Sequence, residues 1–172
     1  MRRIFQDRVA AIILLTVLAM SHSLPAAATT IAIIGTDSVA AALGPEFAAL
    51  GHEVVYGSRN PDRDSVRELV RRTGETARAA GQREAAAGAD IVVLAVPWNV
   101  IEAVAGNLGD LAGKIIIDPT NPRIELDDGL RWHAREQSNA EILQELAPGA
   151  FVVKAFNTMS ATTMSDPAES GG

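Results

Sequence analysis

The sequence predicts a three-layer α/β/α domain built on a parallel, doubly wound sheet. Short apolar runs rich in β-branched residues alternate along the chain with stretches that carry Ala and Leu at helical spacing. Continuous apolar runs are typical of strands buried on both faces, and alternating strands and helices favour a parallel sheet. Because crossover connections are right-handed, we expect the strand order 3-2-1-4-5-6.

The first strand–helix–strand unit lies between residues 31 and 61. Residues 31–34 predict a short buried strand at the centre of the sheet, and Gly35 opens a turn. Residues 38–50 predict a helix that Gly51 ends, and residues 53–56 predict the second strand. This is the layout of a dinucleotide-binding Rossmann unit, in which the adenosine ribose lies at the end of the second strand.

The later elements repeat the same alternation. The predicted strands cover residues 75–79, 89–97, 114–122 and 150–158, and the predicted helices cover residues 61–72, 83–87, 98–107 and 138–146. Pro97 forces the chain out of the sheet, since proline cannot donate to a strand ladder. Ligands of such sheets bind at the carboxyl ends of the strands, where Pro97, Asn121 and Asn157 fall.

The glycine turn departs from its template at one position. In Gly-x-Gly-x-x-Gly the first glycine makes the turn, the second admits the pyrophosphate and the third packs helix on strand. Gly35 keeps the first role, Asp37 occupies the second and Ala40 the third, where alanine is an accepted variant. A carboxylate about 4 Å from a phosphate costs roughly 4 kcal/mol at a near-surface dielectric. Asp37 is therefore expected to weaken dinucleotide binding.

The end of the second strand favours NADP over NAD. An acidic residue there would accept a hydrogen bond from the ribose 2′-hydroxyl of NAD. Ser58 and Arg59 instead offer a hydroxyl and a guanidinium, which suit a 2′-phosphate, and Arg63 could join the same site. The alternative is that Arg59 and Arg63 are ordinary solvated surface charges.

Six short motifs in this order resemble one family. They are Ile-Gly-Thr with the following Ala-Ala-Leu, Leu-Gly-His-Glu-Val, Gly-Ser-Arg-Asn-Pro, Leu-Ala-Val-Pro-Trp, Asp-Pro-Thr-Asn-Pro and Val-Lys-Ala-Phe-Asn-Thr. From about Thr30 onward the chain resembles the NADP oxidoreductases that depend on the deazaflavin coenzyme F420. The wider family includes reductase domains of some ferric-reducing membrane proteins.

The resemblance implies a site for NADP and for a deazaflavin or flavin-like ring that lies against the nicotinamide. The residues implied near the adenosine and the phosphates are Gly35, Thr36, Asp37, Ser38, Val39, Ser58, Arg59 and Arg63. Those nearer the nicotinamide are Ala95, Val96, Pro97, Trp98 and Ala155, to which the strand ends add Asn121 and Asn157. Because hydride transfer between two cofactors depends on face-to-face positioning, no catalytic residue is predicted.

The two ends of the chain differ from the predicted domain of residues 29–159. Residues 1–28 carry an arginine-rich start, an apolar run of twelve residues and an Ala-x-Ala motif, which predict a secretory signal peptide and a periplasmic or secreted protein. An uncleaved membrane anchor is the alternative, whereas no stable membrane insertion is expected after cleavage. Arg2-Arg3 also resembles the twin-arginine export signal. Residues 160–172 predict a polar tail. In the family that the chain resembles, this region continues into helices that help to form the second cofactor site and the dimer, so the sequence does not decide whether the protein is a homodimer.

Composition narrows the remaining functions. The net charge of −6 disfavours nucleic acid as a partner, and the absence of cysteine excludes disulfides and thiolate metal sites. No metal site is predicted from the scattered histidines, and Asp118, Asp127 and Asp128 are interpreted as surface turn or strand-end residues. Two functions remain: an NADP-binding oxidoreductase, or an exported non-catalytic remnant that serves in binding or assembly without nucleotide.

Overall fold

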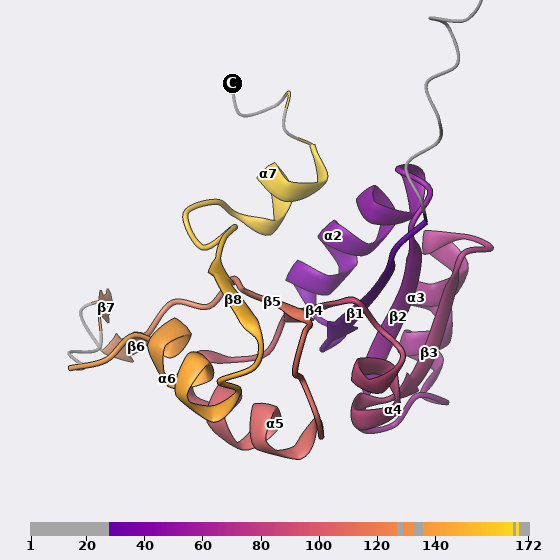
Figure 1. Cartoon of the computed structure of the whole chain (residues 1–172). Coiled ribbons are helices and arrows are strands. Elements are labelled where there is room, and N and C mark those ends of the chain that lie inside the picture. Colours follow the sequence, from indigo (N-terminus) through magenta and orange to yellow (C-terminus); the bar gives the residue numbers. More distant parts are fainter. Residues whose placement is uncertain (1–27, 127–128, 133–135, 167, 169–172) are drawn as a thin grey trace, which may run out of the picture.

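A six-stranded parallel sheet forms the centre of the protein, as the computed structural model shows (Figure 1). The structure describes residues 28–126, 129–132, 136–166 and 168. The strand order is β3-β2-β1-β4-β5-β8. The strands are β1 (Thr30–Ile34), β2 (Glu53–Ser58), β3 (Ala77–Gly81), β4 (Ile91–Leu94), β5 (Ile115–Asp118) and β8 (Phe151–Lys154). The predicted fold class and strand order are confirmed, with β8 as the sixth strand.

Strand β1 lies in the middle because both of its faces are apolar. Its residues pair in parallel register with β2 on one side and β4 on the other. Ile31 and Ile33 point into one core cluster, whereas Ala32 and Ile34 point into the other. This alternation follows from the period of two in a strand, and it places buried side chains in both layers around the sheet.

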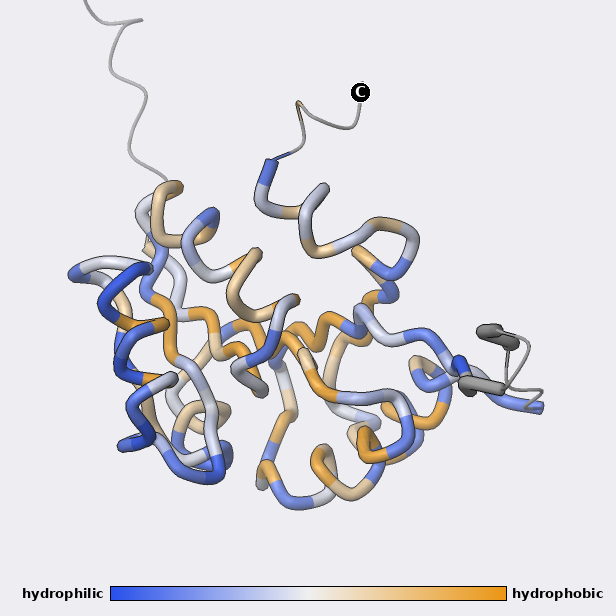
Figure 2. Tube along the Cα trace, turned by 180° about the vertical axis from the view of Figure 1, so that it is seen from behind, coloured by the Kyte–Doolittle hydropathy of each residue, from blue (hydrophilic) through white to orange (hydrophobic). Residues whose placement is uncertain are grey.

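Helices cover both faces of the sheet (Figure 1). One face carries α4 (Gln82–Ala87), α5 (Ile101–Asn107) and α6 (Asn139–Leu146), and the other carries α2 (Ser38–Ala49), α3 (Asp64–Thr73) and α7 (Ala161–Ser165). Figure 2 shows the apolar strands running between these more polar outer layers. The three-layer prediction is therefore confirmed.

Gly44 of helix α2 makes room for the side chain of Tyr56, which extends from strand β2. A Cβ atom at this position would lie 1.7 Å from the hydroxyl of the fully buried Tyr56. That hydroxyl shares a hydrogen bond of 2.7 Å with Thr73 Oγ1. Gly44 thus leaves space for the phenol of Tyr56 against α2, while the position of the template's third glycine is held by the buried Ala40.

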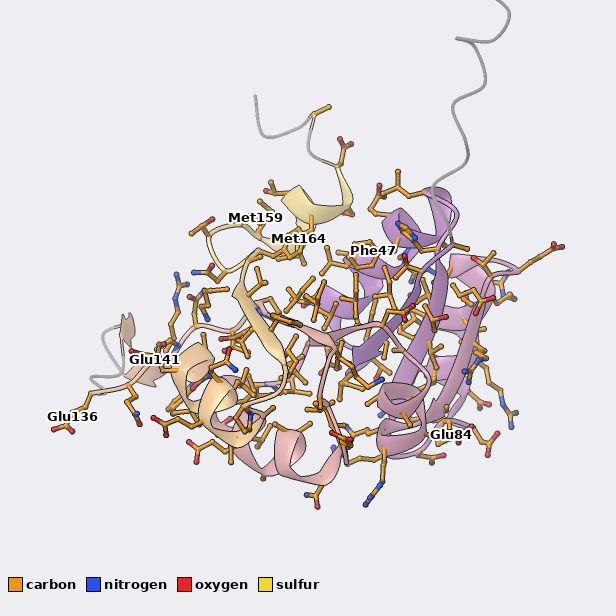
Figure 3. All side chains as sticks on the ribbon, in the orientation of Figure 1. Phe47, Glu84, Glu136, Glu141, Met159 and Met164 are labelled. Carbon is orange, nitrogen blue, oxygen red and sulfur yellow. The ribbon has the colours of Figure 1, made fainter. Side chains whose placement is uncertain are left out.

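Three elements, β6 (Arg123–Leu126), β7 (Gly129–Trp132) and α7, were not expected from the sequence. Strands β6 and β7 form an antiparallel hairpin that projects from the body (Figure 1). Helix α7 lies inside the segment predicted to be a polar tail. It is held by Met164, which is 8% exposed and belongs to the same core cluster as Phe47 of α2, and Figure 3 shows these two side chains between the helices.

Some predicted boundaries also move. Helix α3 begins at Asp64 rather than at Pro61, and β3 spans Ala77–Gly81 rather than residues 75–79. A short 3-10 turn, η1 (Trp98–Val100), precedes α5. Within the described part of the chain, none of the helices has the length and apolar character needed to span a bilayer. The predicted signal peptide lies almost entirely outside the described residues.

Candidate functional site

A cleft of about 610 Å³ opens at the carboxyl ends of β1, β2 and β4. Nine of the predicted site residues line it: Gly35, Thr36, Asp37, Ser58, Arg59, Arg63, Ala95, Val96 and Pro97. Five further residues line the cleft: Gly57 and Asn60, which flank Ser58 and Arg59 in the segment expected to meet the adenosine ribose, and Gln82, Val100 and Val104, which the sequence did not predict. We refer to this cleft as the first cleft.

Gly35 makes the turn at the floor of the first cleft. Its φ of +121° lies in a region that L-residues other than glycine avoid. A Cβ atom here would meet the carbonyl oxygen of Ala95 at 2.0 Å. Its backbone N–H donates to the carbonyl of Gly57 at 3.0 Å, which ties the turn to the end of β2. The backbone conformation and the close contact with Ala95 both require glycine at position 35, as the motif predicts.

The rim of the first cleft near β2 carries the side chains that the sequence predicts to bind phosphate. Ser58 is 8% exposed, and its Oγ accepts a hydrogen bond from the backbone N–H of Asn60 at 3.1 Å. In that bond the Ser58 hydroxyl acts only as an acceptor, so its own O–H can donate a hydrogen bond to a ligand. Arg63 Nη2 donates to Thr36 Oγ1 at 3.1 Å and so connects the start of α3 with the glycine turn. The structure thus brings Thr36, Ser58, Arg59 and Arg63 to one cleft.

Asp37 is the acidic residue among the described side chains that line the first cleft. It is exposed and occupies the N-cap position of α2 in extended backbone conformation. Its side chain makes no capping hydrogen bond, although its carbonyl accepts from the N–H of Ala41 at 2.9 Å. The carboxylate is therefore not committed to the helix, and it stands where the template places the pyrophosphate.

A second cleft of about 300 Å³ adjoins the first. It is lined by Asp37, Ser38, Val39, Ala95, Val96, Pro97, Trp98, Pro119, Thr120 and Asn121. Asp37 and the segment 95–97 line both clefts, so the two clefts share a wall. The predicted residues Ser38, Val39, Trp98 and Asn121 belong to the second cleft.

Ala155 and Asn157 line neither cleft. Asn121 Nδ2 donates to the carbonyl of Asn157 at 2.5 Å, and Asn157 Nδ2 lies 3.5 Å from Asn121 Oδ1. The backbone N–H of Ala155 donates to the carbonyl of Asp118 at 3.3 Å. The structure therefore places both residues behind the second cleft, where they hold the loop that carries Asn121.

Asp118 ends strand β5, as the sequence predicts, but it is buried and does not lie in a surface turn. It is fully buried at the end of β5, where its Oδ2 accepts a hydrogen bond from Lys154 Nζ of β8 at 2.8 Å. Lys154 also donates to the carbonyl of Thr120. The cation on the neighbouring strand thus offsets the cost of burying this carboxylate. The two residues are 36 positions apart in the sequence. Asp127 and Asp128 lie outside the described residues.

The fold and the glycine turn at the end of β1 define a Rossmann-type domain. The family model for NADP oxidoreductases that are dependent on coenzyme F420 matches residues 30–122. The chain therefore belongs to this family, as the motifs predict.

The relatives found by comparison cover most of this chain. Metalloreductase STEAP3 of Rattus norvegicus is 34% identical over 137 residues, which are 80% of this chain and 26% of that protein. The F420-dependent NADP reductase of Methanothermobacter thermautotrophicus is 32% identical over 154 residues, covering 81% of this chain and 65% of the reductase. The chain thus spans less than two thirds of either relative.

A solved structure agrees with both the family and the fold. The candidate F420-dependent NADP reductase of Arthrobacter sp. FB24 superposes with a TM-score of 0.72 at 33% identity. The match covers 81% of this chain and 67% of that one. This agreement confirms the Rossmann-type architecture in a protein of similar sequence.

Proposed function

We propose that this chain binds NADP(H) in the first cleft and exchanges a hydride with a deazaflavin or flavin-like reactant in the second cleft. The observation that carries the proposal is the rim near β2, where Ser58, Arg59 and Arg63 line the cleft together. Two guanidinium groups and a hydroxyl suit a 2′-phosphate. The acidic lining residue, Asp37, lies at the other strand end, after β1, and so does not occupy the position that favours NAD.

The two adjoining clefts supply the geometry that hydride transfer needs. The nucleotide supplies the hydride when it is bound, and the protein orients the two reactants and excludes water between them. Gly35 makes the tight turn at the end of β1, while Ala95, Val96 and Pro97 form the wall common to both clefts. The name of the Methanothermobacter relative, an F420-dependent NADP reductase, supports a deazaflavin as the second reactant.

Nucleotide titration tests the proposal. We expect NADPH to bind more tightly than NADH, and Arg59→Ala to remove most of that preference. A hydrogen bond to a charged group contributes about 1.5 to 3 kcal/mol, or roughly tenfold to a hundredfold in affinity. Arg72→Ala is the matched control, because Arg72 is exposed at the end of α3 and does not line the first cleft. Equal affinities of the parent protein for the two nucleotides would contradict the assignment of this rim.

The second candidate function is a non-catalytic domain that works in binding or assembly without nucleotide. The exposed Asp37 carboxylate at the pyrophosphate position favours it, because like charges repel there. Absence of NADPH binding by both the parent protein and Asp37→Gly would support this candidate and exclude the first.

We further propose that the protein is exported to the periplasm or secreted. The arginine-rich start, apolar run and Ala-x-Ala motif of residues 1–28 support this proposal. Amino-terminal sequencing of protein extracted from cells should find a start within a few residues of Thr29. Soluble protein that still begins at Met1 would contradict it, and loss of export on changing Arg2 and Arg3 to lysine would indicate the twin-arginine route.

A further inference from the structure

A buried carboxamide connects the two loops that form the second cleft. Asn139, the first residue of α6, is 1% exposed. Its Nδ2 donates to Thr120 Oγ1 at 2.8 Å and to the carbonyl of Trp98 at 3.2 Å. Thr120 follows β5 and Trp98 follows β4, and both line the second cleft, whereas Asn139 does not. One side chain thus bridges two walls of the cleft from behind.

The hydrogen-bond chemistry of this position demands a donor. An ionised carboxylate only accepts, so the Thr120 hydroxyl donates to Asp118 Oδ1 at 2.7 Å and presents its lone pairs to Asn139. The Trp98 carbonyl also only accepts. The amide group of Asn139 donates to both acceptors. An aspartate of the same shape would place a carboxylate oxygen, which cannot donate, next to the Trp98 carbonyl and the Thr120 hydroxyl oxygen.

The partners of Asn139 are themselves anchored to rigid elements. Asp118 Oδ1 also accepts from the backbone N–H of Thr120 at 2.9 Å, and Asp118 Oδ2 is held by Lys154 on β8. Trp98 is fixed at its other end, where its indole Nε1 donates to the carbonyl of Arg123 at 2.7 Å. These bonds order each wall separately, and the carboxamide of Asn139 links the Trp98 wall directly to the Thr120 wall.

We propose that Asn139 is a positioning residue that sets the width of the second cleft and, through it, the affinity for the reactant that exchanges hydride with the nucleotide. This inference rests on the proposed function of the second cleft. Asn139 touches no reactant, and it acts through Trp98 and Thr120. Its role is specific to the second cleft because neither Trp98 nor Thr120 lines the first.

Asn139→Asp tests the inference, and Asn139→Ala serves as a second variant that removes the donors without adding charge. Ser138→Ala is the matched control, because it breaks the capping box of the same helix at the adjacent residue. All are made in a Trp132→Phe background, which leaves Trp98 as the single tryptophan of the chain. The measurements are acrylamide quenching of Trp98 fluorescence, the Kd of NADPH, and the KM of coenzyme F420 and of FMN in NADPH-dependent reduction.

We expect both Asn139 variants to raise the Trp98 quenching constant about twofold and the KM of the reactive probe roughly tenfold, as loss of a buried hydrogen bond would. The Kd of NADPH should stay within about twofold. Ser138→Ala should lower the melting temperature while leaving quenching and KM unchanged. Equal effects of the Ser138 and Asn139 variants, or unchanged quenching in the Asn139 variants, would overturn the inference. If the parent reduces neither probe, the proposed function fails, while the quenching comparison still decides the role of Asn139.

Discussion

Replacement of Asp37 by asparagine tests how this glycine turn receives a nucleotide. The substitution removes a negative charge and keeps the shape of the side chain. Asp37 is exposed at the N-cap of α2 and makes no side-chain capping bond. Since asparagine and aspartate are about equally good N-caps, we expect little change in stability. Any change in nucleotide affinity then reports on the charge.

The size of the effect follows from the position of the carboxylate. The pyrophosphate carries two negative charges, and each interacts with a carboxylate about 4 Å away by roughly 1 kcal/mol in water. The exposure of Asp37 makes the water value appropriate, which gives about 2 kcal/mol in total before salt screening. Partial screening at physiological ionic strength leaves about 1 to 2 kcal/mol. Asp37→Asn should therefore tighten NADPH binding by about 5- to 30-fold.

NADPH fluorescence titration at low and high salt measures this gain. Glu46→Gln is the control, since it removes the same charge from an exposed position on the same helix. It lies nine residues further on, or about 14 Å along the axis, which exceeds the screening length of roughly 8 Å. We expect no gain from Glu46→Gln. A gain in Asp37→Asn that persists undiminished at high salt, or that Glu46→Gln reproduces, would refute the electrostatic reasoning.

Three further outcomes follow from the fold. Gly35→Ala should destabilise the protein by about 3 kcal/mol or more in urea denaturation, because the added Cβ meets the Ala95 carbonyl oxygen at 2.0 Å; a loss under about 1 kcal/mol would show that the turn relaxes. Burial raises the pKa of Tyr56 above its ordinary 10.0. The neutral phenol therefore contributes to the free energy of unfolding, and this contribution is fully present below pH 10 and is lost as the pH rises through the folded-state pKa. Because Tyr56 is the single tyrosine, tyrosinate absorbance measures its titration directly, and an unfolded-like pKa in the native protein would contradict this. Lys154→Met should cost about 1 to 3 kcal/mol in thermal unfolding, since it leaves the buried Asp118 carboxylate without its cation, and unchanged stability would show that the neutral donors suffice.

Local pattern accounts for the parts of the fold that the sequence predicts well. The strand, turn and helix from Thr30 to Ala49 depend on apolar runs and on one glycine, which are visible within a short window. The β6–β7 hairpin was missed although residues 123–126 and 130–132 alternate polar and apolar side chains around the turn sequence Asp127-Asp128-Gly129. Each of these runs has only three or four residues, which is too short for the alternation to stand out. Helix α7 was missed because five residues are too few for periodicity to show, and Met164 stabilises it only by packing into a core that α2 helps to build.

The candidate site divides in the same way. Most residues that line the first cleft could be predicted, because they follow β1, β2 and β4, which are neighbours in the sheet and end at one edge of it. Gln82, Val100 and Val104 could not, since they reach the cleft from helical segments whose orientation depends on packing. Nothing in the local sequence distinguishes Asn139 from a solvated residue at a helix start, although Ser138 and Glu141 mark that start as a capping box.

The sequence by itself determined the fold class, the family and the basic side chains that follow β2, because periodicity and short motifs are properties of neighbouring residues. The tertiary structure alone decided that two clefts share Asp37 and the segment 95–97, and that a buried network stands behind the second. That network joins Asp118 to Lys154 across 36 residues and Asn139 to Trp98 across 41. Such pairs are set by strand order and helix packing, and a buried polar group is stable only where the fold delivers its partner.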